Sequence, residues 1–317
     1  MRERWQRTSP VLNVTPREAE ALLRPALGNT SVVAVEPLSG GLSNTNLRAR
    51  LADGSSLVLR LYQRDPTQAR KEAAISALIG SKVPVPRYHH VGERDSNGQT
   101  YAVVEWIDAT ALQPRLRHAS DDDLRIAGHA IGTALAGIHS FTFAEPGFLG
   151  ADLKITPFPG GASSSKFLEM CFAGLASERL GHDFADEVLA YARANEGRSA
   201  VWQDPPRLTH FDFGSSNILM HPDFSLAAVV DWEFAAAASP PADFGNLLRA
   251  PLGTRDAFVA AVEQGYRDAG GFLPDDWQDL VRLADIGAWA EFLSRPHAPE
   301  AVIEDARQVL RQTIGRR

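Results

Sequence analysis

The sequence predicts an α+β protein with two lobes: a small N-terminal lobe built on an antiparallel sheet, and a larger, mainly helical C-terminal lobe. Two observations support this expectation. Between Val32 and Trp106, short apolar runs alternate with turn residues, which is typical of antiparallel strands. After Asp108, apolar residues recur at helical spacing, nearly to the C-terminus. We therefore expect the lobes to span residues 1–108 and 109–317.

Two dipeptides mark hairpin turns in the N-terminal lobe. Asp53-Gly54 separates an apolar run over residues 46–51 from a run over 56–62, and Asn97-Gly98 precedes a run over 100–106. Both dipeptides tolerate the positive φ that tight turns require. The pattern therefore predicts strands over these three runs.

One helix is expected between the two hairpins. Asp65 is suited to the N-cap position, and Pro66 has the fixed φ of a first helical residue. Gly80 is suited to the position that ends such a helix. We predict a helix that starts at Pro66 and ends before Gly80.

The C-terminal lobe begins with a strong helix signal. Ser120 and Asp123 form a capping-box pattern, and the apolar face that follows ends near His139. This pattern predicts a buried central helix. Further helices are predicted over residues 166–180, 183–195, 255–269, 275–294 and 298–314, with a loop over 157–165.

Composition excludes several classes of protein. Apolar residues make up 44% of the chain and charged residues 22%, which is ordinary for a folded globular protein. The net charge is −7, so no basic field is present to attract a nucleic-acid backbone or an anionic membrane. We expect neither partner, and a cationic small substrate would suit the charge better.

The single cysteine, Cys171, cannot form an intrachain disulfide and fits a reducing cytoplasm. The N-terminal residues carry positive charge with no apolar stretch behind them, unlike a signal peptide. No segment reaches the ~20 apolar residues of a membrane-spanning helix. A cytoplasmic location is the resulting expectation.

Polar residues interrupt the helical pattern over 207–235, among short apolar runs that predict strands. Asp212 and Asn217 lie five positions apart, and Asp231 ends an apolar run fourteen residues later. Phosphoryl transfer needs a carboxylate that orients or deprotonates the attacking hydroxyl, and oxygen ligands for magnesium. Asp212 fits the first role, and Asn217 and Asp231 fit the second.

The pattern His-Phe-Asp, four residues, Asn, followed by Asp-Trp-Glu, resembles the paired motifs of the aminoglycoside phosphotransferase and choline kinase family. The resemblance runs from about residue 31 to about 250, with helices beyond. It implies a protein-kinase-like fold. It also implies an ATP-dependent kinase acting on the hydroxyl group of a small molecule.

The resemblance extends to the nucleotide site. Residues 38–46 resemble the loop that covers the nucleotide, and glycines there would let backbone N–H groups approach phosphate. The basic residue of the third strand and its partner glutamate match two positions, and a strand that ends in the hinge would meet the adenine edge. The implied nucleotide-binding residues are Gly40, Gly41, Ser43, Asn44, Arg60, Glu72, Glu105 and Ile107.

Two positions depart from the family pattern in ways that bear on specificity. Phe211 stands where the family often has glycine, which puts a bulky ring beside the expected base. Arg60 replaces the commoner lysine, and its planar fork can still pair with phosphate or carboxylate. Arg60 is therefore compatible with activity, and Phe211 leaves the shape of the substrate undetermined.

Four further residues are candidate substrate contacts that also have structural interpretations. Glu233 would support magnesium or cap the following segment. Asp243 resembles a family aspartate that braces the catalytic loop and can face the substrate. Asp285 and Trp289 lie on a late helix, where acidic or aromatic residues would suit a cationic substrate, although core packing explains them equally well.

The expected function is transfer of the γ-phosphoryl group from ATP, with Mg²⁺, to a small hydroxylated acceptor. GTP stays an alternative donor, because hinge contacts are largely made by the backbone. An antibiotic-modifying kinase and a metabolic kinase of an amino alcohol or sugar are both consistent with the motifs. A catalytically silent nucleotide-binding regulatory protein is the alternative from another class. Oligomeric state is not predicted.

Overall fold

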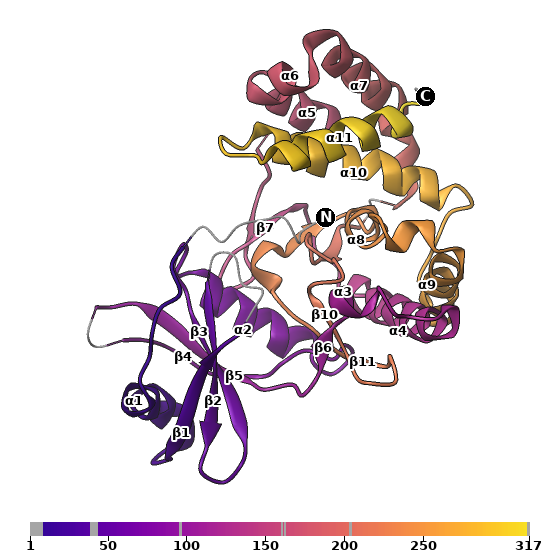
Figure 1. Ribbon diagram of the computed structural model, residues 1–317. Helices are drawn as coiled ribbons and strands as arrows, with labels where there is room; N and C mark the ends of the chain where they lie inside the picture. The colour runs from indigo at the N-terminus through magenta and orange to yellow at the C-terminus, as the bar shows by residue number, and fades with distance from the viewer. Residues whose placement is uncertain are drawn as a thin grey trace.

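The computed structural model confirms the α+β architecture with a sheet-based and a helical lobe (Figure 1). It describes residues 9–38, 44–94, 97–159, 161, 163–202 and 205–315, without the side chains of 199–201.

The N-terminal lobe is a five-stranded antiparallel sheet in the order β1-β2-β3-β5-β4. The three predicted strands are present as β2, β3 and β5. Helices α1 and α2 belong to this lobe. The bounds are α1 (Pro16–Leu27), β1 (Val32–Pro37), β2 (Thr45–Leu51), β3 (Ser56–Leu61), α2 (Gln68–Ile79), β4 (Tyr88–Glu93) and β5 (Thr100–Glu105).

Helix α2 ends before Gly80 as predicted, but it begins two residues later than Pro66. The Asp65 carboxylate does not cap the helix. It accepts hydrogen bonds from the backbone N and the Oγ1 of Thr67, at 2.9 and 2.6 Å, and so closes a turn ahead of the helix. The predicted start was therefore wrong because Asp65 uses its oxygen within that turn.

The C-terminal lobe contains helices in the expected order, and α4 has the predicted capping box at Ser120. The segment 166–180 is two helices, because Gly174 breaks it in a non-helical conformation. The helices are α3 (Leu112–Arg115), α4 (Asp121–His139), α5 (Ser164–Phe172), α6 (Leu175–Leu180), α7 (His182–Asn195), α8 (Pro241–Leu247), α9 (Asp256–Asp268), α10 (Trp277–Ser294) and α11 (Glu300–Thr313).

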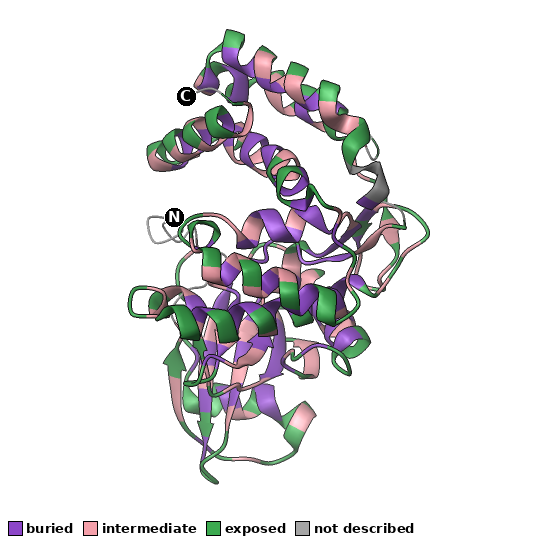
Figure 2. Ribbon diagram, turned by 90° about the vertical axis from the view of Figure 1, so that its right-hand side faces the viewer, coloured by how far each residue is buried: buried purple, intermediate pink, exposed green. Residues whose placement is uncertain are grey.

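Helices α4 and α9 pack closely against each other. Gly132 of α4 and Gly265 of α9 face each other's helix, and a Cβ at either would lie 2.1 Å from a carbonyl oxygen of the other helix. Larger residues would push the helices apart. Helix α10 packs against α5, α8 and α11 (Figure 1). Buried residues follow the facing sides of these helices (Figure 2).

Two small sheets lie in the C-terminal lobe next to the cleft. One has the order β11-β10-β6 and the other β8-β7-β12-β9. Their strands are β6 (Thr110–Ala111), β7 (Gly147–Leu149), β8 (Ile155–Thr156), β9 (Arg207–Thr209), β10 (Ile218–Met220), β11 (Leu226–Val229) and β12 (Ala236–Ala238). In the portion of the chain that the structure describes, no helix is long and apolar enough to cross a membrane.

Candidate active site

The loop between β9 and β10 carries Asp212, and a buried carboxylate holds its backbone. Asp243, at the start of α8, has no exposed surface. Its two oxygens accept hydrogen bonds from the backbone N–H groups of His210 and Phe211, both at 2.8 Å. Asp243 therefore braces the loop from beneath, which is one of the two roles expected for it.

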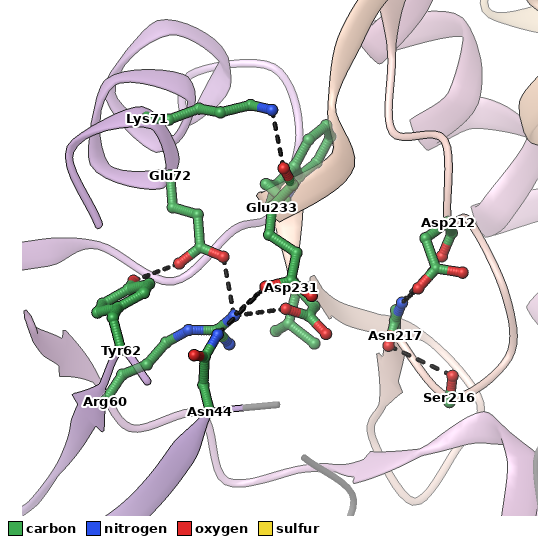
Figure 3. Close-up of polar contacts among 12 residues, drawn as sticks. Asn44, Arg60, Tyr62, Lys71, Glu72, Asp212, Ser216, Asn217, Asp231 and Glu233 are labelled. Atoms are coloured by element: carbon green, nitrogen blue, oxygen red, sulfur yellow. Dashed lines mark hydrogen bonds and ion pairs between the residues drawn. The ribbon is translucent and has the colours of Figure 1, made fainter. Parts of the chain in front are cut away.

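Asp212 and Asn217 are in direct contact within this loop. The Asn217 Nδ2 donates to the main-chain oxygen of Asp212 at 2.9 Å and to its Oδ2 at 3.0 Å (Figure 3). The amide oxygen of Asn217 accepts a hydrogen bond from the Ser216 Oγ at 3.3 Å, and its second lone pair is left for another ligand. Both side chains line the main cleft.

The hairpin formed by β10 and β11 brings Asp231 next to Asn217. Ile218 pairs with Val229, and the Val230 N–H donates to the main-chain oxygen of Asn217 at 2.9 Å. Asp231 follows directly, with a φ of +70°, a left-handed conformation that turns the chain out of the strand. The spacing of fourteen residues is therefore the length of this hairpin.

Arg60 of β3 reaches across from the N-terminal lobe to the same point. Its Nη2 lies 2.9 Å from Glu72 Oε1 and 2.6 Å from Asp231 Oδ1, and 3.8 Å from Glu233 Oε2 (Figure 3). The carboxylates of Glu72 and Asp231 raise the pKa of Arg60 well above its usual value, although burial opposes them. Arg60 is therefore a permanent cation held by two acids.

Glu72 is fully buried, and two hydroxyl groups contact its carboxylate in addition to Arg60. The hydroxyl groups of Tyr62 and Tyr88 both donate to Glu72 Oε2, the second at 2.8 Å. Burial raises the pKa of Glu72, whereas Arg60 lowers it. The two tyrosines fix the carboxylate that in turn orients Arg60.

Glu233 is held by two groups of the N-terminal lobe. Asn44 Nδ2 donates to its Oε2 at 3.1 Å, and Lys71 Nζ donates to its main-chain oxygen at 2.8 Å. Burial, and after it the charge of Asp231, raises the pKa of Glu233 to about 7. Burial likewise lowers the pKa of Lys71 to about 8. Glu233 lies close to Asp231, which is compatible with a role in holding magnesium. That role stays a prediction.

Replacing Glu233 with glutamine is expected to stabilise the protein more at pH 8 than at pH 5. The pKa of Glu233 in the folded state, about 7, lies above the usual 4.5. The protonated carboxyl therefore contributes stability that is fully present below pH 4.5 and is lost as the pH rises through 7. The difference is at most about 3 kcal/mol. Urea unfolding at both pH values measures it, with Glu169→Gln as an exposed control. Equal shifts for the two variants would contradict the assignment.

Two buried atoms of residues that line the cleft lack a hydrogen-bond partner among the residues described: Arg60 Nε and Asn46 Oδ1. An unpaired buried donor is costly unless a ligand satisfies it. A phosphate oxygen would pair with the Arg60 Nε–H. The carboxylate of Asp231 and the amide oxygen of Asn217 are hard oxygen donors of the kind magnesium prefers. The residues therefore fit a magnesium-bound nucleoside phosphate.

One cleft of about 2020 Å³ is lined by Asn46, Arg60, Asp212, Asn217, Asp231 and Glu233. In the part of the cleft formed by the N-terminal lobe, the lining includes Glu105, Ile107, Val58 and Val104. The Glu105 N–H donates to the Arg87 oxygen at 2.9 Å. Adenine contacts would therefore fall to the Glu105 carbonyl and to Ile107.

Two histidines behind the loop, His210 and His139, are buried. His210 Nε2 lies 3.0 Å from the Val230 oxygen, and its Nδ1 accepts from the Asp212 N–H at 3.3 Å. His139 lies 3.2 Å from Asp243 and 3.0 Å from the hydroxyl of Tyr266. Both support the loop from behind.

Asp285 and Trp289 lie on α10, and Asp285 lines the same cleft as Asp212. Trp289 is 1% exposed, and its Nε1 donates to Asp285 Oδ2 at 2.7 Å. Arg249 pairs with the same carboxylate at 2.5 Å. In this arrangement their polar atoms are used within the protein, and contact with a substrate stays a prediction.

Three predicted nucleotide contacts, Gly40, Gly41 and Ser43, lie outside the described residues. Several residues of the site were not predicted, because their partners are distant in sequence. Asn46 follows the glycine-rich segment, Lys71 precedes the expected Glu72, and Arg249 lies 36 positions from Asp285. The one available signal was that Lys71 adjoins a predicted site residue.

Comparisons with known proteins agree with this geometry. Residues 34–280 match the model of the phosphotransferase enzyme family. None of the curated proteins matches the chain. Among solved structures, a thermostable mutant of aminoglycoside phosphotransferase APH(4)-Ia in its apo form is similar, with a TM-score of 0.64 and 16% identity over 93% of this chain and 98% of that one.

Two similar structures contain ligands. A variant of the same thermostable mutant, in ternary complex with AMP-PNP and hygromycin B, has a TM-score of 0.63 and 18% identity, over 93% of this chain and 97% of that one. The GDP and kanamycin complex of APH(2")-IIIa has a TM-score of 0.69 and 17% identity, over 92% and 97%. At these identities the likeness establishes the shared fold.

Proposed function

Because the chain belongs to the phosphotransferase enzyme family, we propose that it transfers the γ-phosphoryl group of ATP to a hydroxyl group of a small molecule. The observation that carries the proposal is that Arg60, Asp231, Asn217 and Asp212 line one cleft. These are the cation, the two oxygen ligands and the carboxylate that the reaction requires. The similar structures with AMP-PNP, hygromycin B and kanamycin agree with this proposal.

Asp212 has the role of orienting and deprotonating the acceptor hydroxyl. Its Oδ2 is fixed by Asn217 at 3.0 Å, and its main chain is fixed through Asp243, so the carboxylate is held before a substrate arrives. A preorganised base loses little freedom when the acceptor binds. The residue would hold the proton that the hydroxyl gives up.

Asp231 and Asn217 would hold magnesium, which neutralises charge on the phosphate oxygens when it is bound. Asp231 Oδ1 pairs with Arg60 at 2.6 Å in this conformation. A cation held at that oxygen would compete with Arg60 for it, which would favour Arg60 turning toward the nucleotide. The guanidinium then has its Nε and Nη groups for phosphate oxygens, which suits a planar fork.

The test is whether nucleotide binding depends on magnesium through Asp231. Titration of AMP-PNP with and without Mg²⁺ should show tighter binding with the metal, because the metal neutralises phosphate charge, and Asp231→Asn should abolish that difference. Asp223→Asn, an exposed aspartate in the β10–β11 turn, is the matched control. A coupled ADP-release assay against hydroxylated compounds then measures turnover, with GTP as the alternative donor.

Two results would argue against the proposal. Nucleotide binding with no magnesium dependence and no ADP release would favour a silent nucleotide-binding regulatory protein. An Asp231→Asn variant that binds and turns over like the natural chain would remove Asp231 from the metal site.

A further inference from the structure

Three phenylalanines form a continuous row beside Asp212. The ring centroids of Phe148 and Phe158 lie 4.8 Å apart in an edge-to-face arrangement, and those of Phe158 and Phe211 lie 6.1 Å apart. All three line the cleft that contains Asp212. The row leads directly to the expected base, because Phe211 precedes Asp212 in the chain.

Two of the three rings are exposed and Phe158 is half-buried, although all three are large and apolar. Phe148 is 46% exposed and Phe211 is 36% exposed. Phe211 also has a φ of +65°, which is unfavourable for a bulky residue. Asp243 accepts its N–H, and Asn246 donates to its carbonyl at 3.1 Å. The fold therefore maintains a strained conformation that presents an aromatic ring to the cleft.

Further apolar side chains line the same cleft from the helices across it. Phe167 of α5 lies over α10, where a Cβ at Gly287 would be 3.7 Å from its ring. Leu283 and Phe292 of α10 and Val302 of α11 also line the cleft. Apolar side chains therefore line the part of the cleft beyond Asp212 on both sides, with polar residues such as Ser239 and Asn246 between them.

The acidic residues in that part of the cleft are each paired with an arginine. Among the described residues that line it, the acids outside the hinge and the phosphoryl-transfer centre are Asp285 and Glu291. Asp285 is buried and pairs with Arg249 at 2.5 Å. Glu291 pairs with Arg295 at 2.7 Å. A polycationic acceptor would have to compete with both arginines for these carboxylates.

We propose that the acceptor is an uncharged alcohol with an aromatic or other bulky apolar group close to its reacting hydroxyl. The inference rests on the proposed phosphotransferase function. The alcohol oxygen bonds to the γ-phosphorus as the bond from that phosphorus to the ADP oxygen breaks, and the hydroxyl proton passes to Asp212. Phe148, Phe158 and Phe211 hold the apolar group and thereby determine specificity.

The test compares two probes on protein saturated with AMP-PNP and Mg²⁺. Saturation-transfer NMR should detect binding of 3-phenylpropan-1-ol and none of kanamycin. Phe158→Ala and Phe211→Gly should each weaken binding of the alcohol roughly tenfold, because each removes a ring that the ligand covers. Phe211→Gly also relieves the positive φ, so it should remain folded. Phe272→Ala, an exposed phenylalanine outside the cleft, is the control.

Each other outcome overturns the inference. Kanamycin binding without binding of the alcohol would indicate a cationic acceptor and leave the phosphotransferase proposal intact. Absence of alcohol binding, or equal binding to both cleft variants and the control, would remove the aromatic row from the acceptor site. Failure to bind AMP-PNP would instead overturn the proposed function, and this inference with it.

Discussion

Replacing Asp212 with asparagine should lower kcat for phosphoryl transfer by about 10²- to 10⁴-fold, the usual contribution of a general base. Asparagine keeps an oxygen for the Asn217 Nδ2, so the loop should retain its conformation. The substituted side chain cannot accept the hydroxyl proton. Steady-state kinetics with an acceptor found by the ADP-release assay give kcat and KM separately.

The affinity of the Asp212→Asn variant for Mg-AMP-PNP should stay close to that of the natural chain, because Asp231, Asn217 and Arg60 are unchanged. This comparison separates loss of the base from loss of the nucleotide site. Unchanged phosphorylation of the acceptor by a variant that binds nucleotide normally would show that Asp212 is not the base.

Removal of the Asp243 carboxylate should have the largest effect on stability. Asp243→Ala leaves the N–H groups of His210 and Phe211 and the ring of His139 without their buried acceptor. Breaking such a buried charged network typically costs about 3–5 kcal/mol. Urea unfolding of the variant and of the natural chain measures the difference.

Asp268→Ala is the matched control for Asp243, because it removes an aspartate that pairs with a histidine at the surface, where both side chains are 51% exposed. An exposed pair of this kind contributes about 1 kcal/mol or less. Asp243→Asn should fall between the two, since it keeps the shape but has one acceptor oxygen. If Asp243→Ala lowered the free energy of unfolding as little as the control does, the loop would be stable without the Asp243 carboxylate.

Local signals in the sequence predicted most of the fold. The capping box at Ser120 and the Asp53-Gly54 turn act through neighbouring residues, and both were confirmed. Helix α1 was not predicted, although Thr15 and Glu18 form a capping box there. The break at Gly174 was missed as well, because a single glycine inside a helical pattern can also be tolerated.

The sequence predicted several residues of the candidate site, but it did not predict which of them pair with each other across the two lobes. The spacing of Asp212, Asn217 and Asp231 is short-range, because one loop and one hairpin contain it. The pair between Arg60 and Asp231 joins residues 171 positions apart, so no local pattern indicates it. The pairing of Asp285 with Arg249 likewise depends on how α10 packs against the segment that follows α8, which is a property of the tertiary structure.

The pair between Arg60 and Asp231 has a consequence for how affinity should be interpreted. Asp231 acts as an internal counter-ion for the guanidinium that a phosphate group must use. A nucleotide therefore binds in exchange for an existing interaction, and its dissociation constant contains the free energy of that competition. Asp231→Asn weakens the competitor as well as the metal site, so nucleotide binding measured without magnesium should become tighter in that variant.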